Sequence, residues 1–249
     1  MTDPSDTAPD FPSIRRLGLT GMLVSFAGKM SEPANRAALA FRAAFDADWP
    51  EGVTESASSL VSCFVRFDPL RLTHATLHRQ VQALLDQRDW YAAVLPGGRR
   101  LWRVPTVFGT DLAPQLGQAA QAAGLSEAEA VRSLSQARVR VQTIGFAPGQ
   151  PYLGELPPAW DIPRKKELTP RVPEGALVVA LRQLVLFSVT TPTGWQHVGQ
   201  TAIRLFQPHA PEPFLLRPGD EVQFTRTDPE TLARMRSDPR GGASCEALA

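Results

Sequence analysis

The sequence predicts an α+β protein: a small N-terminal α/β sandwich, followed by a barrel or folded-over sheet of short strands. Over residues 14–90, apolar side chains recur alternately with the period of strands and of helices, in the order ββαβα. From Arg138 onward, short apolar runs alternate with proline or glycine breaks, a spacing typical of a barrel or a folded sheet. A chain of 249 residues is long enough for two domains of medium size.

The composition is that of an ordinary globular protein, with 43% hydrophobic and 20% charged residues. Twenty-six basic residues face twenty-five acidic ones, so the chain lacks the concentrated positive field that a nucleic-acid partner needs. No run reaches the roughly 18 apolar residues of a membrane span, and the acidic, proline-rich start does not resemble a signal peptide. Cys63 lies in an apolar run and is expected to be a buried thiol that forms no disulfide with Cys245. These features predict a cytoplasmic protein.

Changes in composition along the chain predict its domain boundaries. Residues 1–12 are acidic and proline-rich and are expected to be disordered. The N-terminal α+β domain is predicted over residues 13–95, and the barrel domain, with a helical insertion, over residues 96–228. Residues 229–249 are expected to form a flexible C-terminal tail after one helical turn, which Asp228 can cap.

The elements of the first domain follow from local patterns. Residues 14–28 predict two short strands around a glycine turn. A helix is expected over residues 31–48, with Ser31 as its N-cap. A strand over residues 58–68 and a second helix over residues 73–90 complete the domain. The side chains expected to face its core are Ala37, Leu39, Phe41, Phe45, Leu60, Cys63 or Phe64, Val65, Phe67, Leu77, Val81, Leu84 and Leu85.

The predicted helical insertion consists of two short helices joined by a glycine. Asp111 can cap the first helix, over residues 112–123. Ser126 and Glu129 have the spacing of a capping box at the start of the second helix, over residues 125–135.

Familiar catalytic and ligand-binding motifs are absent. Two distant cysteines and four scattered histidines do not have zinc-site spacing, so no metal site is expected. His74 and His78 are four residues apart on a helix but lack the HExxH context, and a solvated pair is the better interpretation. The sequence contains no phosphate-binding glycine loop and no nucleophile elbow. Arg99, Arg100 and Arg103 could contact a phosphate, although such a cluster is more often a solvated turn.

The stretch "IGFAPGQPYLGELP", residues 144–157, combines three prolines and three glycines with apolar residues. This composition predicts a stiff loop rather than a regular helix or strand. Prolines restrict the backbone, and glycines allow close approach or positive φ. Such a loop can form the wall of a pocket for a small polar molecule. A barrel-corner loop with a purely structural role is an equally good interpretation.

The same stretch, followed by "RVPEG" and "GWQHVGQTAIRLF", resembles the signature of the KipI / allophanate hydrolase subunit 1 family, which includes the B component of 5-oxoprolinase. The segments "SSLVSCFVRFDP", "VPTVFG" and "LRPGDEVQF" are similar to other family segments, and the resemblance covers roughly residues 13–226. It implies a small N-terminal α/β domain and a C-terminal cyclophilin-like β-barrel.

The resemblance also implies a function. Family members work with a KipA-like protein, the C component of 5-oxoprolinase, and with a LamB/YcsF-like protein, its A component. Together they open 5-oxoproline to L-glutamate with ATP. Related modules form the carboxyltransferase part of urea carboxylase.

The chain is therefore expected to be a subunit of an ATP-dependent 5-oxoprolinase, a hydrolase of cyclic amides, or of a related carboxyltransferase or allophanate hydrolase-type complex. ATP would be shared with the partner proteins. The alternative is a KipI-like regulatory protein that inhibits a histidine kinase and has no catalysis of its own.

Several residues of the resembling segments are candidates for holding a substrate, but no catalytic residue is assigned. Arg164 and Arg171 suit a carboxylate or phosphate, or they form surface ion pairs. Gln183 could bond an amide or lactam, or make a polar contact within the barrel. His197 lies close to Trp195, where an apolar residue is usual in the family. The predicted substrate-binding set is Gly145, Phe146, Ala147, Pro148, Gly149, Tyr152, Arg164, Arg171, Gln183 and Trp195.

The chain departs from the family pattern at several places. Leu134 and Val139 stand where the family usually has a histidine and a tyrosine. Leu181 and Leu184 replace small or polar residues, and Thr193 replaces a glycine. Because histidine is the side chain that ordinarily titrates near neutral pH, its loss alters the proton chemistry that the pocket can support. The sequence leaves open whether the altered pocket is active.

Overall fold

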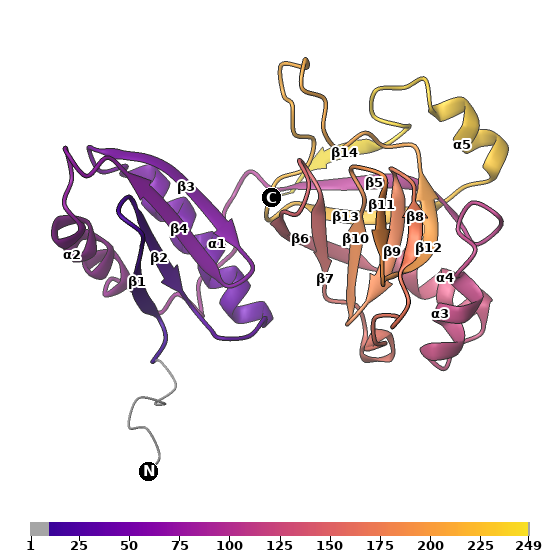
Figure 1. Cartoon of the computed structure of the whole chain (residues 1–249), viewed down its shortest axis with the longest axis horizontal. Coiled ribbons are helices and arrows are strands. Elements are labelled where there is room, and N and C mark those ends of the chain that lie inside the picture. Colours follow the sequence, from indigo (N-terminus) through magenta and orange to yellow (C-terminus); the bar gives the residue numbers. More distant parts are fainter. Residues whose placement is uncertain (1–9, 249) are drawn as a thin grey trace, which may run out of the picture. The chain divides into compact units, whose positions relative to one another are not determined.

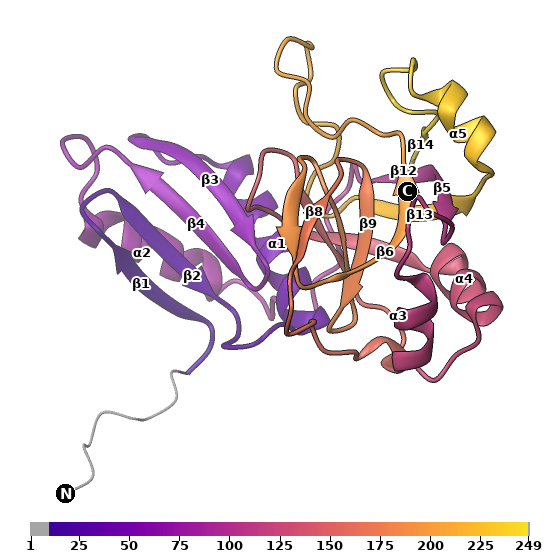
Figure 2. The ribbon, with the colours of Figure 1, turned by 45° about the vertical axis from the view of Figure 1, so that its right-hand side comes forward.

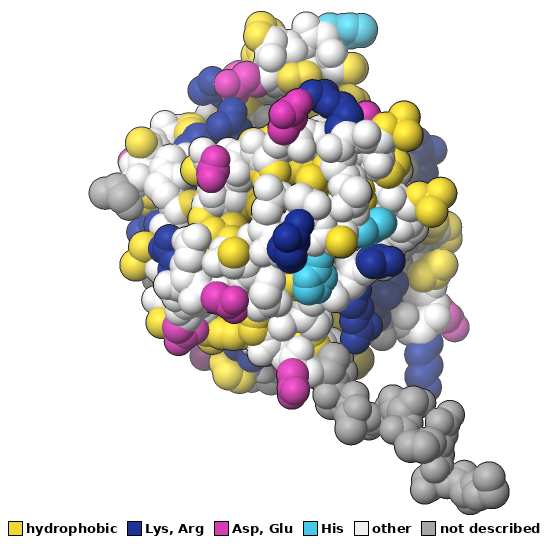
Figure 3. Space-filling view, turned by 90° about the vertical axis from the view of Figure 1, so that its left-hand side faces the viewer, with side chains coloured by type: hydrophobic (Ala, Val, Ile, Leu, Met, Phe, Trp, Pro, Cys, Tyr) yellow, Lys and Arg dark blue, Asp and Glu magenta, His cyan; other side chains and the backbone are white. Residues whose placement is uncertain are grey.

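The computed structural model describes residues 10–248 and divides into two compact units that meet between Pro96 and Gly97 (Figure 1). Most of the N-terminal segment predicted to be disordered, residues 1–12, lies outside the described residues. On the face drawn in Figure 3, basic and acidic side chains are interspersed, as expected for a net charge of +1.

The N-terminal unit is a four-stranded antiparallel sheet with strand order β1-β2-β4-β3 (Figures 1 and 2). Apolar residues of both helices share one buried cluster with alternate residues of β2 and β4, so both helices pack on the same face of the sheet. The elements are β1 (Ser13–Leu17), β2 (Gly21–Ser25), α1 (Glu32–Ala47), β3 (Val53–Ser59), β4 (Ser62–Phe67) and α2 (His74–Leu85).

The prediction of a single strand over residues 58–68 is wrong, because two strands meet there. The chain turns between β3 and β4 at Leu60, whose φ of 47° is typical of a turn. Leu60 is therefore a turn residue rather than part of the core. β3 escaped prediction because it is a polar edge strand whose only well-buried side chains are Val53 and Ser56. In β4, Cys63 faces the core, whereas Phe64 does not.

The C-terminal unit contains a closed barrel, as predicted. Its main sheet has the order β12-β9-β10-β7-β6-β13-β5-β14, and β12 also pairs with β5, so seven strands form a ring (Figure 1). One half of β5 pairs with β14 and the other half with β12. The strands are β5 (Arg100–Phe108), β6 (Arg138–Ile144), β7 (Pro151–Gly154), β9 (Ala176–Ala180), β10 (Gln183–Leu186), β12 (Gln196–Thr201), β13 (Glu221–Arg226) and β14 (Ser244–Ala247).

Strand β9 is buried on both faces. Leu177 and Val179 belong to the main barrel core. The alternate residues, including Val178, pack in a second apolar cluster together with Val172 and Trp195. Val172 comes from a separate two-stranded sheet of β8 (Thr169–Val172) and β11 (Thr191–Thr193). Burial on both faces explains why this strand is a continuous apolar run.

Two helices, α3 (Leu116–Ala122) and α4 (Glu127–Gln136), form the insertion. The predicted capping box between Ser126 and Glu129 is confirmed. The predicted Asp111 cap is wrong, because α3 begins later, with Gln115 at the N-cap. Pro114 disfavours a helical backbone at the residue before it, which delays the start of the helix.

The C-terminal tail is ordered within the described residues, in contrast to the prediction for residues 229–249. Asp228 caps α5 (Pro229–Met235) by accepting a hydrogen bond from the Thr231 amide, as predicted. Gly241 and Gly242 then adopt φ values of 60° and 76°. Beyond this turn the chain forms β14, which pairs antiparallel with β5.

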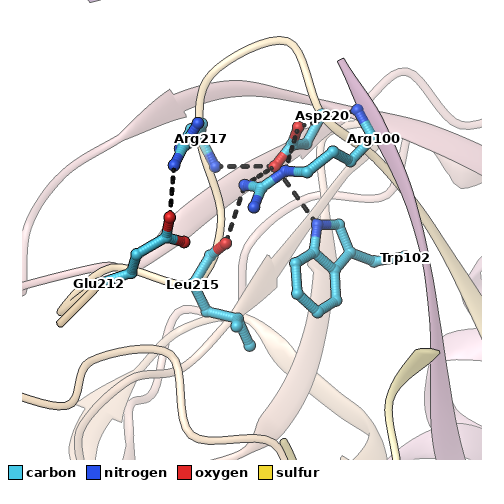
Figure 4. A network of polar contacts seen from close by, with 6 residues as sticks. All are labelled: Arg100, Trp102, Glu212, Leu215, Arg217 and Asp220. Atoms are coloured by element: carbon cyan, nitrogen blue, oxygen red, sulfur yellow. Dashed lines mark hydrogen bonds and ion pairs between the residues drawn. The ribbon is translucent and has the colours of Figure 1, made fainter. Parts of the chain in front are cut away.

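A buried carboxylate connects β13 to β5 (Figure 4). Asp220 is 2% exposed and forms an ion pair with Arg100, with 2.6 Å between Nη2 and Oδ2. It also accepts hydrogen bonds from the indole of Trp102 and the backbone amide of Arg217. Arg99 pairs with Glu221 and Arg103 with Glu246. The predicted arginine cluster therefore consists of ion pairs along β5 rather than a phosphate site or a solvated turn.

Candidate functional site

The stretch predicted to be a stiff loop is a β-hairpin. Ile144 ends β6 and residues 151–154 form β7, so the prediction that this run contains no strand is wrong. The connecting loop is closed by a hydrogen bond from the Gly145 amide to the Gln150 carbonyl, at 3.0 Å. Pro151 is the first residue of β7, a strand position that tolerates a proline.

One side of this loop is packed and the other is exposed. Gly149 has a φ of 71°, and a β-carbon there would lie 2.8 Å from the Leu205 carbonyl oxygen. Only glycine fits such a close approach with positive φ. Phe146 also has a φ of 71°, yet its side chain is 75% exposed. Ala147 is half-buried and Pro148 is exposed.

The remaining predicted site residues lie on different parts of the barrel. Gln183 donates a hydrogen bond to Gln142, at 2.7 Å, which joins β10 to β6. The rings of Tyr152 and Trp195 meet edge to face, 6.3 Å apart, in the second apolar cluster. Arg164 is exposed, and its segment lies beside the turn that leads into β12.

Of the predicted site residues, Arg171 lines a pocket of about 290 Å³, which we call the His197 pocket. The pocket lies between the segment before α3, the end of β8, strand β12 and the end of α5. Its lining residues are Asp111, Leu112, Pro114, Gln115, Thr169, Arg171, Val172, Pro173, Glu174, His197, Gln200 and Arg236.

His197 is the buried titratable group of this pocket. It pairs with Val178 of β9, so its side chain is on the face of the barrel that carries the second apolar cluster. Gln115 holds the backbone of His197 through two hydrogen bonds. Its side-chain Oε1 accepts from the backbone amide of His197 at 2.7 Å, and its backbone amide donates to the carbonyl of His197 at 3.1 Å. Burial lowers the pKa of His197, and polar contacts with Gly199 and Gln200 oppose this effect. At neutral pH the imidazole is therefore uncharged.

Two further side chains that line the pocket, Gln200 and Thr169, are held by hydrogen bonds. Gln200 donates from Nε2 to the carbonyls of Glu174, at 2.9 Å, and Thr201, at 3.0 Å. The Thr169 hydroxyl oxygen accepts from Gln115, at 2.9 Å, and from the Lys165 ammonium. Burial lowers the pKa of Lys165, and the nearby charge of Glu167 opposes this. The pocket lining thus includes polar side chains that are hydrogen-bonded to the surrounding backbone and side chains.

The family of the chain follows from comparison with known proteins. Residues 12–216 match the model of the family described as carboxyltransferase domain, subdomain C and D. The chain belongs to this family. The carboxyltransferase family match covers most of the described barrel and nearly all of the N-terminal unit.

Two family relatives are named as the B subunit of 5-oxoprolinase. The protein from Escherichia coli O157:H7 is 40% identical over 139 residues, which are 55% of this chain and 64% of the relative. The protein from Bacillus subtilis strain 168 is 29% identical over 223 residues, 86% of this chain and 92% of the relative. The match to the E. coli protein thus spans less than two thirds of its length, and the match to the B. subtilis protein spans nearly all of it.

Solved structures share the fold. The crystal structure of TTHA0988 is 31% identical with a TM-score of 0.70, and the match covers 87% of this chain and 40% of that one. The Kluyveromyces lactis urea carboxylase has a TM-score of 0.72 at 17% identity, over 94% of this chain and 24% of that one. The second likeness concerns the fold alone.

Three of the departures from the resembling family pattern lie in the main apolar cluster. Leu134, Val139 and Leu184 are almost fully buried in the main cluster, so apolar packing occupies these positions. Leu181 is 50% exposed in the turn between β9 and β10, with a φ of 52°. Thr193 is buried, and its hydroxyl accepts from the Trp195 amide at 3.1 Å.

Sequence reasoning identified Arg171 and considered His197, but it missed Gln115, Thr169 and Gln200. A regular strand would place His197 and Gln200 on opposite faces. An irregular register between residues 197 and 199 returns Gln200 to the face of His197. The sequence carries no signal for this shift.

The described residues define what the carboxyltransferase-family chain can do chemically. Among residues 10–248, no cluster of three histidine, cysteine, aspartate or glutamate side chains is placed to hold a metal ion. No helix in this range is long and apolar enough to cross a bilayer. The His197 pocket offers a neutral imidazole, fixed amide and hydroxyl groups, and two guanidinium groups. Such a set can bind and orient a small polar molecule.

Proposed function

We propose that this chain is the B-type subunit of an ATP-dependent complex that opens 5-oxoproline to L-glutamate, or of a related amide-processing carboxyltransferase-type complex. The observation that carries the proposal is the match to the B subunit of 5-oxoprolinase from Bacillus subtilis, which extends over most of both chains. The match to the B subunit of 5-oxoprolinase from Escherichia coli O157:H7, at 40% identity over 139 residues, supports the same assignment.

The proposed complex needs partners. TTHA0988 and the urea carboxylase are much longer than the region that this chain matches, so in them the unit is joined to further polypeptide. The partners proposed here are a KipA-like protein of the 5-oxoprolinase C type and a LamB/YcsF-like protein of the A type. ATP would be bound with these partners, because this chain has no local nucleotide motif. The complex would work in the cytoplasm.

This chain would contribute binding and electrostatics. Guanidinium groups such as Arg164 and Arg171 would hold the carboxylate of the substrate or a phosphorylated lactam. The amide of Gly149 and the second N–H of the Gln183 side chain, whose first N–H is bonded to Gln142, would face the developing oxyanion, and Gly145 would help to close the loop. The aromatic residues Phe146, Tyr152 and Trp195, with Ala147 and Pro148, would shape the surroundings of the substrate.

Reconstitution tests the proposal. The chain is co-expressed with a KipA-like and a LamB-like protein, the complex is isolated by a tag on this chain, and ATP-dependent glutamate release from 5-oxoproline is measured. We expect co-purification and release that requires all three proteins. A complex that forms but releases no glutamate from 5-oxoproline, and hydrolyses no ATP with related amides, would contradict the proposal. Arg79→Gln, an exposed charge change on α2, serves as the control for surface charge.

The alternative is a KipI-like regulator that binds a histidine kinase and has no catalysis. The apolar residues Leu134 and Val139 favour it, since they stand where the resemblance implies groups able to exchange protons. Inhibition of kinase autophosphorylation by the chain alone, together with silent reconstitutions, would establish this second function.

A further inference from the structure

Two glutamine side chains meet across strand β7. Strands β6, β7 and β10 are neighbours in the main sheet (Figure 1). Gln183, the first residue of β10, donates from Nε2 to Oε1 of Gln142 in β6, at 2.7 Å. Neighbouring strands lie about 4.8 Å apart, so the backbones of β6 and β10 are roughly 10 Å apart and the two side chains reach over β7. Because Leu184 belongs to the main core, Gln183 is on the outer face of the barrel.

Gly154 of β7 makes this crossing possible. A β-carbon at residue 154 would lie 2.8 Å from Nε2, 2.9 Å from Oε1 and 3.0 Å from Cδ of Gln142. The three distances are nearly equal, so the carboxamide of Gln142 lies flat over Gly154. An alanine at this position would come too close to the carboxamide and displace it. The glycine therefore accommodates the side chain of Gln142, which is 1% exposed.

The amide of Gln183 is held at one end and open at the other. The bond to Gln142 is its only side-chain hydrogen bond within residues 10–248, and it uses one of two N–H groups. Its Oε1 has no partner in this range and is not enclosed by protein atoms, and the side chain is partly exposed. Because a carboxamide is planar, the bond to Gln142 also restricts where Oε1 and the second N–H can lie. Gln183 thus presents an oriented donor and acceptor on the barrel surface.

We propose that Gln142 is a positioning residue for the reaction given above, and in that respect the inference rests on the proposed function. Gln142 is buried and acts through Gln183, whose second N–H it directs toward the developing oxyanion. A donor that is already in place needs no rearrangement when charge develops, which is why such donors are effective in catalysis. An unrestrained glutamine side chain would have to be ordered in every cycle, at a cost of about tenfold in rate.

Kinetics of the reconstituted complex test this role. Gln142→Met keeps the length of the side chain and removes the acceptor, so kcat and kcat/KM should both fall about tenfold with KM unchanged. Gln142→Glu restores an acceptor oxygen and should recover most of the lost kcat. Gly154→Ala should reproduce the loss with both glutamines present. Gln223→Met is the matched control, because this glutamine of β13 bonds the Ser135 carbonyl at 3.2 Å, and its kcat should be that of the wild type.

A double variant separates positioning from a general structural effect. Gln183→Ala alone should lower kcat by about 10²–10³-fold, the usual effect of losing one oxyanion donor. Gln142→Met should cause no further loss in that background, since its effect passes through Gln183. An equal tenfold loss in both backgrounds, or no loss in either, would overturn the proposal. Far-UV circular dichroism, thermal unfolding and co-purification verify folding and assembly, and Gln142→Asn, one methylene shorter, replaces a Gln142→Met that fails to fold.

Nuclear magnetic resonance of the isolated chain measures the orientation of Gln183 without any activity. The side-chain amide signals of Gln183, assigned by their loss in Gln183→Ala, should indicate an ordered group in the wild type and a mobile one in Gln142→Met. A mobile amide in the wild type would overturn the positioning. An active complex that is insensitive to Gln142→Met removes the role of Gln142 and retains the proposed function. If every reconstitution is silent while the amide is ordered, the proposed function falls together with the reaction that Gln142 would serve, and the measured contact stands.

Discussion

Replacing Asp220 by alanine should strongly destabilise the barrel unit. The Asp220 carboxylate accepts from three groups of Arg100: the backbone amide at 3.1 Å, Nε at 3.3 Å and Nη2 at 2.6 Å. It also accepts from the Trp102 indole at 3.3 Å and from the Arg217 amide at 3.0 Å. Alanine removes every one of these acceptors, whereas the donors stay in place.

The expected loss follows from what remains behind. Arg100 is only 18% exposed, and without Asp220 its guanidinium keeps the Leu215 carbonyl, at 2.9 Å, and the face of Trp102. Removing one partner of a buried ion pair typically costs about 3–5 kcal/mol, because the other charge stays buried. The Trp102 indole and the backbone amides of Arg100 and Arg217 also lose their acceptor, so we expect a loss in the upper part of this range. Since a whole domain is stable by about 5–15 kcal/mol, such a loss is a large share.

Urea unfolding with hydrogen-exchange mass spectrometry measures this loss and follows the two units separately. Glu212→Ala is the matched control, because its pair with Arg217 spans 3.4 Å between side chains that are 69% and 59% exposed, and it should cost less than about 1 kcal/mol. A double variant, Arg100→Met with Asp220→Leu, should recover much of the lost stability. A loss below about 1 kcal/mol for Asp220→Ala would refute the reasoning.

Three further predictions concern pH, backbone strain and thiol chemistry. Burial lowers the pKa of His197 when the chain folds, so the unfolded chain takes up a proton at a higher pH than the folded chain does. The contribution of His197 to the free energy of unfolding should therefore be complete above pH 6.5 and decrease as the pH falls below that value. His197→Leu should flatten this pH dependence in urea titrations. Leu181→Gly should raise the unfolding free energy by about 0.5–1 kcal/mol, since relief of a left-handed leucine exceeds the added chain entropy; a decrease would contradict this. Ellman's reagent should titrate one thiol of the native chain, the exposed Cys245, and two in urea, because burial raises the pKa of Cys63 to about 12; two reactive native thiols would be evidence against the buried position.

The order of elements in the N-terminal unit could be predicted from sequence wherever apolar periodicity is strong. Phe41 and Phe45 in α1, and Val81 and Leu85 in α2, face the core as their spacing indicates. β3 carries no such signal, because an edge strand with one solvated face needs few apolar residues. Apolar periodicity in the sequence therefore indicates burial, and sequence analysis misses strands and helices that bury few side chains.

The prediction of a flexible tail after α5 was wrong for a different reason. Its small and polar residues have little tendency to form a strand. The four exposed residues of β14 are ordered because β5 offers them backbone hydrogen-bond partners, from Arg100 to Arg103. A strand that is stabilised by its neighbour's backbone leaves almost no trace in its own side chains.

The candidate site was hard to predict because it depends on burial of an outer barrel face. A polar residue on the outside of a closed barrel normally faces water, so His197 alone gives no reason to expect a pocket. Gln115 and the β8 segment cover that face only once α3 and the β8–β11 sheet are in place. The relevant contacts join residues that are far apart in the sequence.

The two faces of the barrel strands differ in polarity, and this difference explains how a polar pocket is compatible with a stable fold. The interior is packed with apolar side chains, including Val139 and Leu184, and barrel closure between β12 and β5 depends on backbone pairing. His197 and Gln200 lie on β12 outside this interior, so replacing either of them leaves the interior packing in place. A polar-to-apolar exchange inside the barrel removes buried groups that would need partners, which stabilises the fold. On the outer face, α3 and the β8–β11 sheet cover polar side chains that would otherwise face water.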